Sequence, residues 1–130
     1  MLTLLLPFAA LAQSLPAPPA FFDPFFLFFD CGIAEVGAQH TDTIGNIHQA
    51  FEANKAKRVE VVGHADRKGS ASYNLTLSRR RAEAIKAALV SHGVPVGAIT
   101  ADAVGEDRPI VETADGVAEA KNRFVTVMIY

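Results

Sequence analysis

The stretch Val62–Ala82, which reads VGHADRKGSASYNLTLSRRRA, constrains the fold of this chain more than any other. It begins as the end of a valine-rich strand, passes through a polar loop containing Gly69, and continues as a helix. Asp66 follows the strand directly, and Arg81 lies within the helix. Because α/β folds place their ligand sites where strands end and helices begin, we expect the rest of the chain to hold this pair in place.

The remaining elements alternate around this stretch. Apolar residues three or four apart predict helices over Val36–Asn54 and Asn74–Ser91, the second with Ser72 or Asn74 as its N-cap. Together with a long loop over Gly105–Ala120, they predict an α+β fold. We expect a two-layer sandwich with a mixed β-α-β-α-β-β sheet and two helices on one face. The expected strands are Phe25–Asp30, Arg58–His64, Ala98–Ala103 and Phe124–Tyr130.

The aromatic run Phe21–Phe29 contains the first of these strands. Pro24 interrupts the run, so the strand proper begins after it. A continuous apolar run of this length predicts a strand covered on both faces. It is too short, and too interrupted by Asp23 and Pro24, for a membrane-spanning helix.

Residues 1–12, MLTLLLPFAALA, have the apolar core and the small-residue ending of a secretory signal peptide, with cleavage expected after Ala12. The alternative is a buried strand. Residues 13–24 then form a Pro-rich linker, and residues 25–130 form one domain. We therefore expect an exported chain with no transmembrane segment after cleavage.

Composition excludes several classes of site and partner. A net charge of −2 gives no basic surplus for binding nucleic acid. Cys31 is the single cysteine, which excludes an internal disulfide and is tolerable in an oxidising compartment if it is buried. The preceding Phe28, Phe29 and Asp30 do not form a lipidation motif. No metal site and no cofactor are expected, because the four histidines lack metal-ligand spacing.

The chemistry of the central stretch suggests a ligand. A carboxylate and a guanidinium that are close together, and both accessible, can hold a zwitterion. The carboxylate accepts from an ammonium, and the guanidinium donates two parallel hydrogen bonds to a carboxylate. The matching ligand is the head of a free amino acid, such as the one that diaminopimelate displays in the peptide stems of bacterial cell walls.

Short motifs that follow one another in a fixed order support this interpretation of the central stretch. They are Gly63-His64-Ala65-Asp66, Gly69, Tyr73-Asn74, Leu77-Ser78, Arg81-Ala82, Gly93-Val94, Gly105-Glu106, Pro109 and Asn122-Arg123. From about Phe28 to Tyr130 the chain resembles the OmpA-like peptidoglycan-binding domain family. The resemblance implies non-covalent binding of peptidoglycan in the periplasm or at the outer membrane of a Gram-negative envelope.

The resemblance also implies roles for particular residues. Asp66 would bind the ammonium of diaminopimelate and Arg81 its carboxylate, while Asn74, Leu77 and Arg123 would line or brace the pocket. The sequence departs from the family pattern at two positions. Ala65 replaces a usual threonine, and Phe124 replaces a second arginine.

Other interpretations of individual side chains stay open. Asp66 could be a loop-capping carboxylate, and Tyr73 a pocket wall. Arg79 and Arg80 are interpreted as solvated helix charges. Glu106 is interpreted as a tether for the long loop rather than a ligand contact.

Two other functions are considered. A wall hydrolase using His64 and Asp66 is not expected, because the sequence places no nucleophilic serine or cysteine beside a base, so we predict no enzymatic activity. The second alternative is a protein-interaction module of an outer-membrane or envelope assembly that does not bind the wall itself. Its partner would dock on Phe21–Phe29.

Overall fold

The computed structural model describes residues 23–130. The predicted signal peptide over residues 1–12 and linker residues 13–22 lie outside this range. They stay predictions, as does the domain boundary at residue 25. No helix in the described part of the chain is long and apolar enough to cross a membrane.

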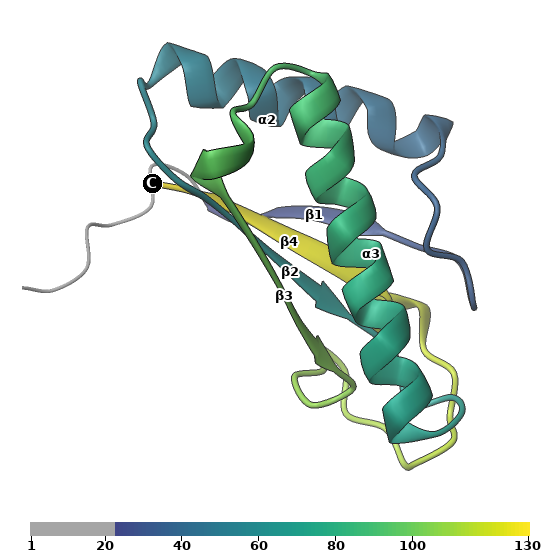
Figure 1. The fold of residues 1–130 in the computed structure, drawn as a ribbon. Coiled ribbons are helices and arrows are strands. Elements are labelled where there is room, and N and C mark those ends of the chain that lie inside the picture. The colour runs from purple at the N-terminus through teal and green to yellow at the C-terminus, as the bar shows by residue number, and fades with distance from the viewer. Residues whose placement is uncertain (1–22) are drawn as a thin grey trace, which may run out of the picture.

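Two helices, α2 (Thr41–Ala53) and α3 (Ala71–Ser91), cross one face of a four-stranded sheet (Figure 1). The strand order is β1-β4-β2-β3. Strands β2 and β3 run parallel, and β4 is antiparallel to both of its neighbours, β1 and β2. The predicted α+β class and two-layer mixed architecture are therefore confirmed. The strands are β1 (Phe25–Phe28), β2 (Val59–His64), β3 (Ile99–Gly105) and β4 (Phe124–Ile129).

The core lies between the helices and the sheet. The predicted apolar stripe of α2 is buried, and so is the predicted face of α3. Alternate residues of β2 and β4 meet these helices, as the period of a strand requires. The core members from these four elements include Ile44, Ile47, Phe51, Val59, Val61, Ala82, Ile85, Leu89, Val125, Val127 and Ile129.

The prediction that the aromatic strand is covered on both faces is wrong. Strand β1 lies at the edge of the sheet and ends at Phe28 instead of Asp30. Leu27 is buried, but Phe26 and Phe28 are 42% and 48% exposed. Both helices cover the opposite face, so alternate phenylalanines of the run point to the uncovered one.

Element boundaries differ from the predictions near the caps. A 3-10 turn over Ala38–His40 precedes α2, so the first α-helix starts later than Val36. Helix α3 starts before Asn74, because the Ser70 hydroxyl accepts a hydrogen bond from the Tyr73 N–H at 3.2 Å. The predicted N-caps, Ser72 and Asn74, lie inside the helix instead. Strand β3 continues beyond Ala103 to Gly105.

Helix α3 approaches β2 closely at one glycine. A Cβ at Gly63 would lie 1.9 Å from the carbonyl oxygen of Ser78. Any side chain there would overlap the helix backbone. The glycine therefore lets α3 lie directly on β2, one turn before Arg81.

Candidate functional site

Asp66 lies just beyond β2 and is 5% exposed. Its Oδ1 accepts from the Lys68 N–H at 3.2 Å, and its Oδ2 accepts from the Glu119 N–H at 3.0 Å. The Oδ2 atom also pairs with Nη1 of Arg123 at 3.1 Å. Asp66 therefore caps its own loop, as the alternative interpretation expects, but it also ties that loop to the residues that precede β4.

Arg81 is fully buried, although it is charged. Its guanidinium donates to three backbone carbonyls, from Asp30 (Nη2, 3.0 Å), Ile33 (Nε, 2.8 Å) and His64 (Nη1, 3.2 Å). Burial lowers the pKa of Arg81 to about 10, while the nearby carboxylate of Asp66 opposes this shift. The side chain therefore stays cationic at neutral pH and fastens the segment after β1 to α3.

One cavity brings the five predicted site residues together. Its volume is about 190 Å3, and Asp66 and Arg81 line it from the end of β2 and from α3. No ion pair between these two side chains exists within residues 23–130; the partner of Asp66 is Arg123. The remaining lining residues are Cys31, Gly32, Lys68, Gly69, Tyr73, Asn74, Leu77 and Arg123.

Arg123 reaches the cavity from the residue before β4. Its Nε donates to the Phe29 carbonyl at 3.0 Å, and its Nη1 reaches Asp66. The cavity therefore contains two guanidinium groups and one carboxylate that is already paired to one of them. This arrangement leaves Arg81 as the guanidinium without a carboxylate partner in the described chain.

The two departures from the family pattern lie in different surroundings. Ala65 is buried, and its N–H donates to the Gly105 carbonyl at 2.9 Å. Phe124 is buried against the ring of His64, with the ring centroids 4.1 Å apart, and contacts Phe26 and Phe28. The ring that replaces an arginine therefore belongs to an aromatic cluster and does not line the cavity.

His64 is buried beside this aromatic cluster. Burial lowers its pKa to about 4, although a hydrogen bond to the Arg108 backbone opposes the shift. Its Nδ1 has no hydrogen-bond partner in the described chain. The side chain is therefore a neutral ring at physiological pH, and its contribution to the cavity is the backbone carbonyl that Arg81 binds.

Three further residues lie at or beside the cavity. Cys31, which the sequence did not indicate as a site residue, is exposed and lines the cavity together with Gly32. Tyr73 is half exposed and forms a wall of the cavity, as expected. Glu106 accepts from Nδ2 of Asn74 at 2.9 Å, so it joins the loop after β3 to α3. A bend after an edge strand carries no sequence signal that would have indicated the role of Cys31.

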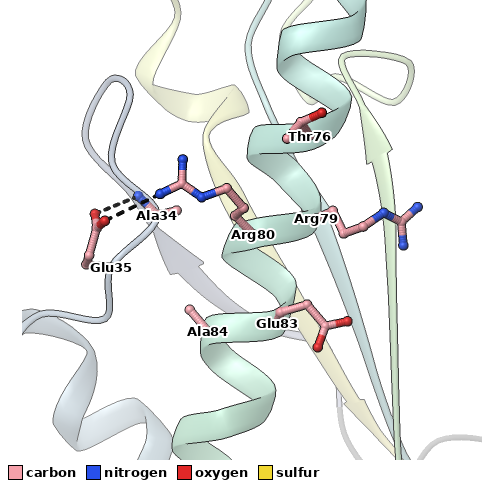
Figure 2. Close-up of a pocket in the computed structure, with 7 residues that line it drawn as sticks. All are labelled: Ala34, Glu35, Thr76, Arg79, Arg80, Glu83 and Ala84. Carbon is pink, nitrogen blue, oxygen red and sulfur yellow. Dashed lines mark hydrogen bonds and ion pairs between the residues drawn. The ribbon is translucent and has the colours of Figure 1, made fainter.

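A larger hollow of about 590 Å3 lies on the outer side of α3 (Figure 2). Figure 2 shows Arg80 turned toward Glu35, while Arg79 and Glu83 point away from Glu35. The Arg80–Glu35 pair spans 3.6 Å, and its side chains are 58% and 71% exposed. Exposed pairs of this kind are worth about 0–1 kcal/mol, so we assign the candidate site to the smaller cavity, which the buried Asp66 and Arg81 line.

No group of three or more metal-ligating side chains occurs within residues 23–130. The smaller cavity instead offers hydrogen-bond donors and acceptors of both charges. Such a set suits a small zwitterionic ligand better than a metal ion.

Comparisons with known proteins agree with this fold. The model of the OmpA family matches residues 28–123. An outer membrane protein of Gluconacetobacter diazotrophicus is 32% identical over 112 residues, which cover 82% of this chain and 30% of the relative. A peptidoglycan-associated lipoprotein of Pasteurella multocida is 40% identical over 77 residues, which cover 58% of this chain and 51% of the relative. The chain thus spans about a third to a half of the length of these curated relatives.

A solved structure extends the comparison to the whole fold. The crystal structure of the peptidoglycan-associated lipoprotein from Burkholderia pseudomallei superposes with a TM-score of 0.73 at 26% identity. The superposition covers 81% of this chain and 89% of that chain. The likeness therefore extends over most of both chains.

Proposed function

Because the chain belongs to the OmpA family, we propose that it binds peptidoglycan non-covalently through the free amino acid head of diaminopimelate. Asp66 accepts from the ammonium, and Arg81 donates to the carboxylate. Asn74, Leu77 and Arg123 complete the pocket. The observation that carries the proposal is that residues from separate parts of the sequence line one cavity of about 190 Å3.

Unused hydrogen-bonding capacity supports these two roles. A carboxylate has about four acceptor positions, and Asp66 receives three N–H groups. A guanidinium has five N–H donors, and Arg81 places three on carbonyls. About one acceptor position of Asp66 and two N–H donors of Arg81 are therefore unused among the described residues.

The size of the cavity fits a small ligand head. At about 30 Å3 of liquid volume per water molecule, the cavity has room for roughly six waters. An ammonium, a carboxylate and the carbon between them occupy less than that. A few charge-assisted hydrogen bonds predict single-site affinity in the micromolar to millimolar range. The wall presents many copies of the ligand, so rebinding compensates for weak single sites.

The names of the relatives support an envelope location. They are outer-membrane and peptidoglycan-associated proteins, and we place this chain in the periplasm, attached to the wall of a Gram-negative cell. The proposal includes no catalysis. His64 is a buried neutral ring that stacks on Phe124, and it faces neither a serine nor a cysteine among the contacts of the described residues.

The proposal is tested by co-sedimentation with purified sacculi that contain diaminopimelate. Asp66→Asn removes the negative charge that faces the ammonium, and we expect at least about tenfold weaker binding. The matched control is Asp115→Asn, which removes an exposed carboxylate that also pairs with an arginine, Arg67. We expect this control to bind like the wild type.

Thermal unfolding of both variants is measured alongside, so that a loss of fold is not mistaken for a loss of binding. Wild-type binding by a folded Asp66→Asn variant would contradict the assignment of the pocket. Release of soluble fragments from sacculi would revive the hydrolase alternative.

A further inference from the structure

The Asn74 amide makes only part of its possible hydrogen bonds. The side chain lies in the first turn of α3 and is 1% exposed. Its Nδ2 donates to Oε2 of Glu106 at 2.9 Å. Its Oδ1 is buried and has no partner within residues 23–130. Buried amide oxygens are nearly always paired, so an unpaired one in a cavity calls for an explanation.

The chemistry of Glu106 determines which end of the amide faces the cavity. An ionised carboxylate can only accept hydrogen bonds, so Asn74 must turn its NH2 group toward Glu106. The amide oxygen then points away from Glu106. Asn74 lines the same cavity as Asp66 and Arg81, and its oxygen lies toward Gly69, another residue of the cavity wall.

Glu106 itself is held against α3. The preceding Gly105 has a φ of 60°, a conformation that favours glycine, and a Cβ there would lie 3.2 Å from the Cα of Leu75. Its N–H donates to the hydroxyl of Ser78 at 3.0 Å. The backbone that leads into Glu106 is therefore held against α3, and the carboxylate itself contacts Asn74.

We propose that Glu106 is a positioning residue that orients the Asn74 amide so that the cavity recognises an ammonium group. This inference rests on the proposed function. The Asn74 oxygen and the Asp66 carboxylate both accept only, so together they select a group with several N–H donors. A ligand with a hydroxyl or a methylene in place of the ammonium leaves one of these acceptors unpaired and is disfavoured.

The experiment compares two ligands, meso-diaminopimelate and pimelate, which lacks both ammonium groups. Binding is measured by NMR titration of the wild type, Glu106→Leu and Glu106→Gln. We expect Glu106→Leu to weaken binding of diaminopimelate by about tenfold, because the amide is no longer oriented. Binding of pimelate stays unchanged. Glu106→Gln recovers part of the loss, because its side-chain oxygen can still accept from Asn74.

Equal losses for both ligands would overturn the inference, because they would make Glu106 a simple tether of the loop. An unchanged affinity for diaminopimelate in Glu106→Leu would overturn it as well. Urea unfolding of each variant identifies any that do not fold.

A ligand-free measurement separates this inference from the proposed function. The side-chain N–H signals of Asn74 should exchange slowly with water in the wild type and rapidly in Glu106→Leu. If the wild type binds neither compound, the proposed ammonium site fails with the proposed function. Equal exchange in both proteins would contradict the orienting role of Glu106, whatever the ligand results.

Discussion

Helix α3 contains three consecutive arginines at positions 79–81, and they have different surroundings on the two sides of the helix. Arg81 is fully buried and donates to three carbonyls at the cavity. Arg80 lies on the outer side and pairs with the exposed Glu35 (Figure 2). Successive helix residues point about 100° apart, so one step along the chain separates a buried charge from a solvated one. The direction in which an arginine side chain points therefore decides whether its charge is buried or solvated.

The electrostatics of the two sides differ in the same way. On the inner side, burial is the largest influence on the pKa of Arg81, and Asp66 opposes it. On the outer side, the pKa of Glu35 is lowered first by the backbone N–H groups of Glu35 and Ala34, and least by Arg80. The inner charges are tied to the fold, whereas the outer pair is close to free ions in water.

The largest expected loss of stability comes from a substitution that pushes α3 away from the sheet. Gly63→Ala places a Cβ 1.9 Å from the Ser78 carbonyl, so the helix backbone must move. We expect a loss of about 4 kcal/mol or more in the free energy of unfolding, measured with urea. The control is Gly45→Ala in α2, where a Cβ meets nothing within 4 Å. It should gain about 1 kcal/mol from helix propensity. A small loss in Gly63→Ala would show that the close approach is not required.

The second comparison uses two arginines of the same helix. Arg81→Met removes three hydrogen bonds to backbone carbonyls, and we expect a loss of about 3 kcal/mol or more in the free energy of unfolding. Arg79→Met changes an exposed side chain and should stay within about 0.5 kcal/mol of the wild type. Equal urea midpoints for the two variants would contradict the buried role of Arg81. Because Arg81 supports the fold, its binding defect is interpreted only where the variant is folded.

The third and smallest effect is on the pH dependence of the free energy of unfolding. The pKa of His64 falls from 6.5 to about 4 on folding, so the unfolded chain binds a proton before the folded one does. This contribution to stability is complete above pH 6.5 and is lost as the pH falls toward 4. His64→Phe keeps a ring against Phe124 and removes the titration. Between pH 7 and pH 5, urea unfolding should show the variant losing about 2 kcal/mol less stability than the wild type. Parallel losses would contradict the buried neutral ring.

Local patterns predicted the helices, the strands and the mixed sheet, because each element buries residues at its own period. The strand–loop–helix stretch Val62–Ala82 predicted Asp66 and Arg81 as site residues, and both line one cavity. The partner of Asp66 was not predictable from local pattern. Arg123 reaches Asp66 because β4 lies between β1 and β2, and strand order depends on the whole sheet.

Two other misses have local physical causes. A continuous apolar run does not reveal whether one or both faces of its strand are covered, so the exposure of Phe26 and Phe28 was missed. Two serines, Ser70 and Ser72, lie near the start of α3 and compete as N-caps, and the geometry of the loop selects Ser70. Residue type alone left both questions open.

The most direct test of the account is the choice between two wall fragments. Lysine at the stem position of diaminopimelate keeps the side-chain ammonium but lacks the carboxylate that Arg81 would bind. Binding of soluble stem peptides with either residue is measured by calorimetry or NMR titration. The account predicts that the diaminopimelate peptide binds in the micromolar to millimolar range, and at least about tenfold more tightly than the lysine peptide. Equal affinity for the two peptides, or binding of neither, would contradict it.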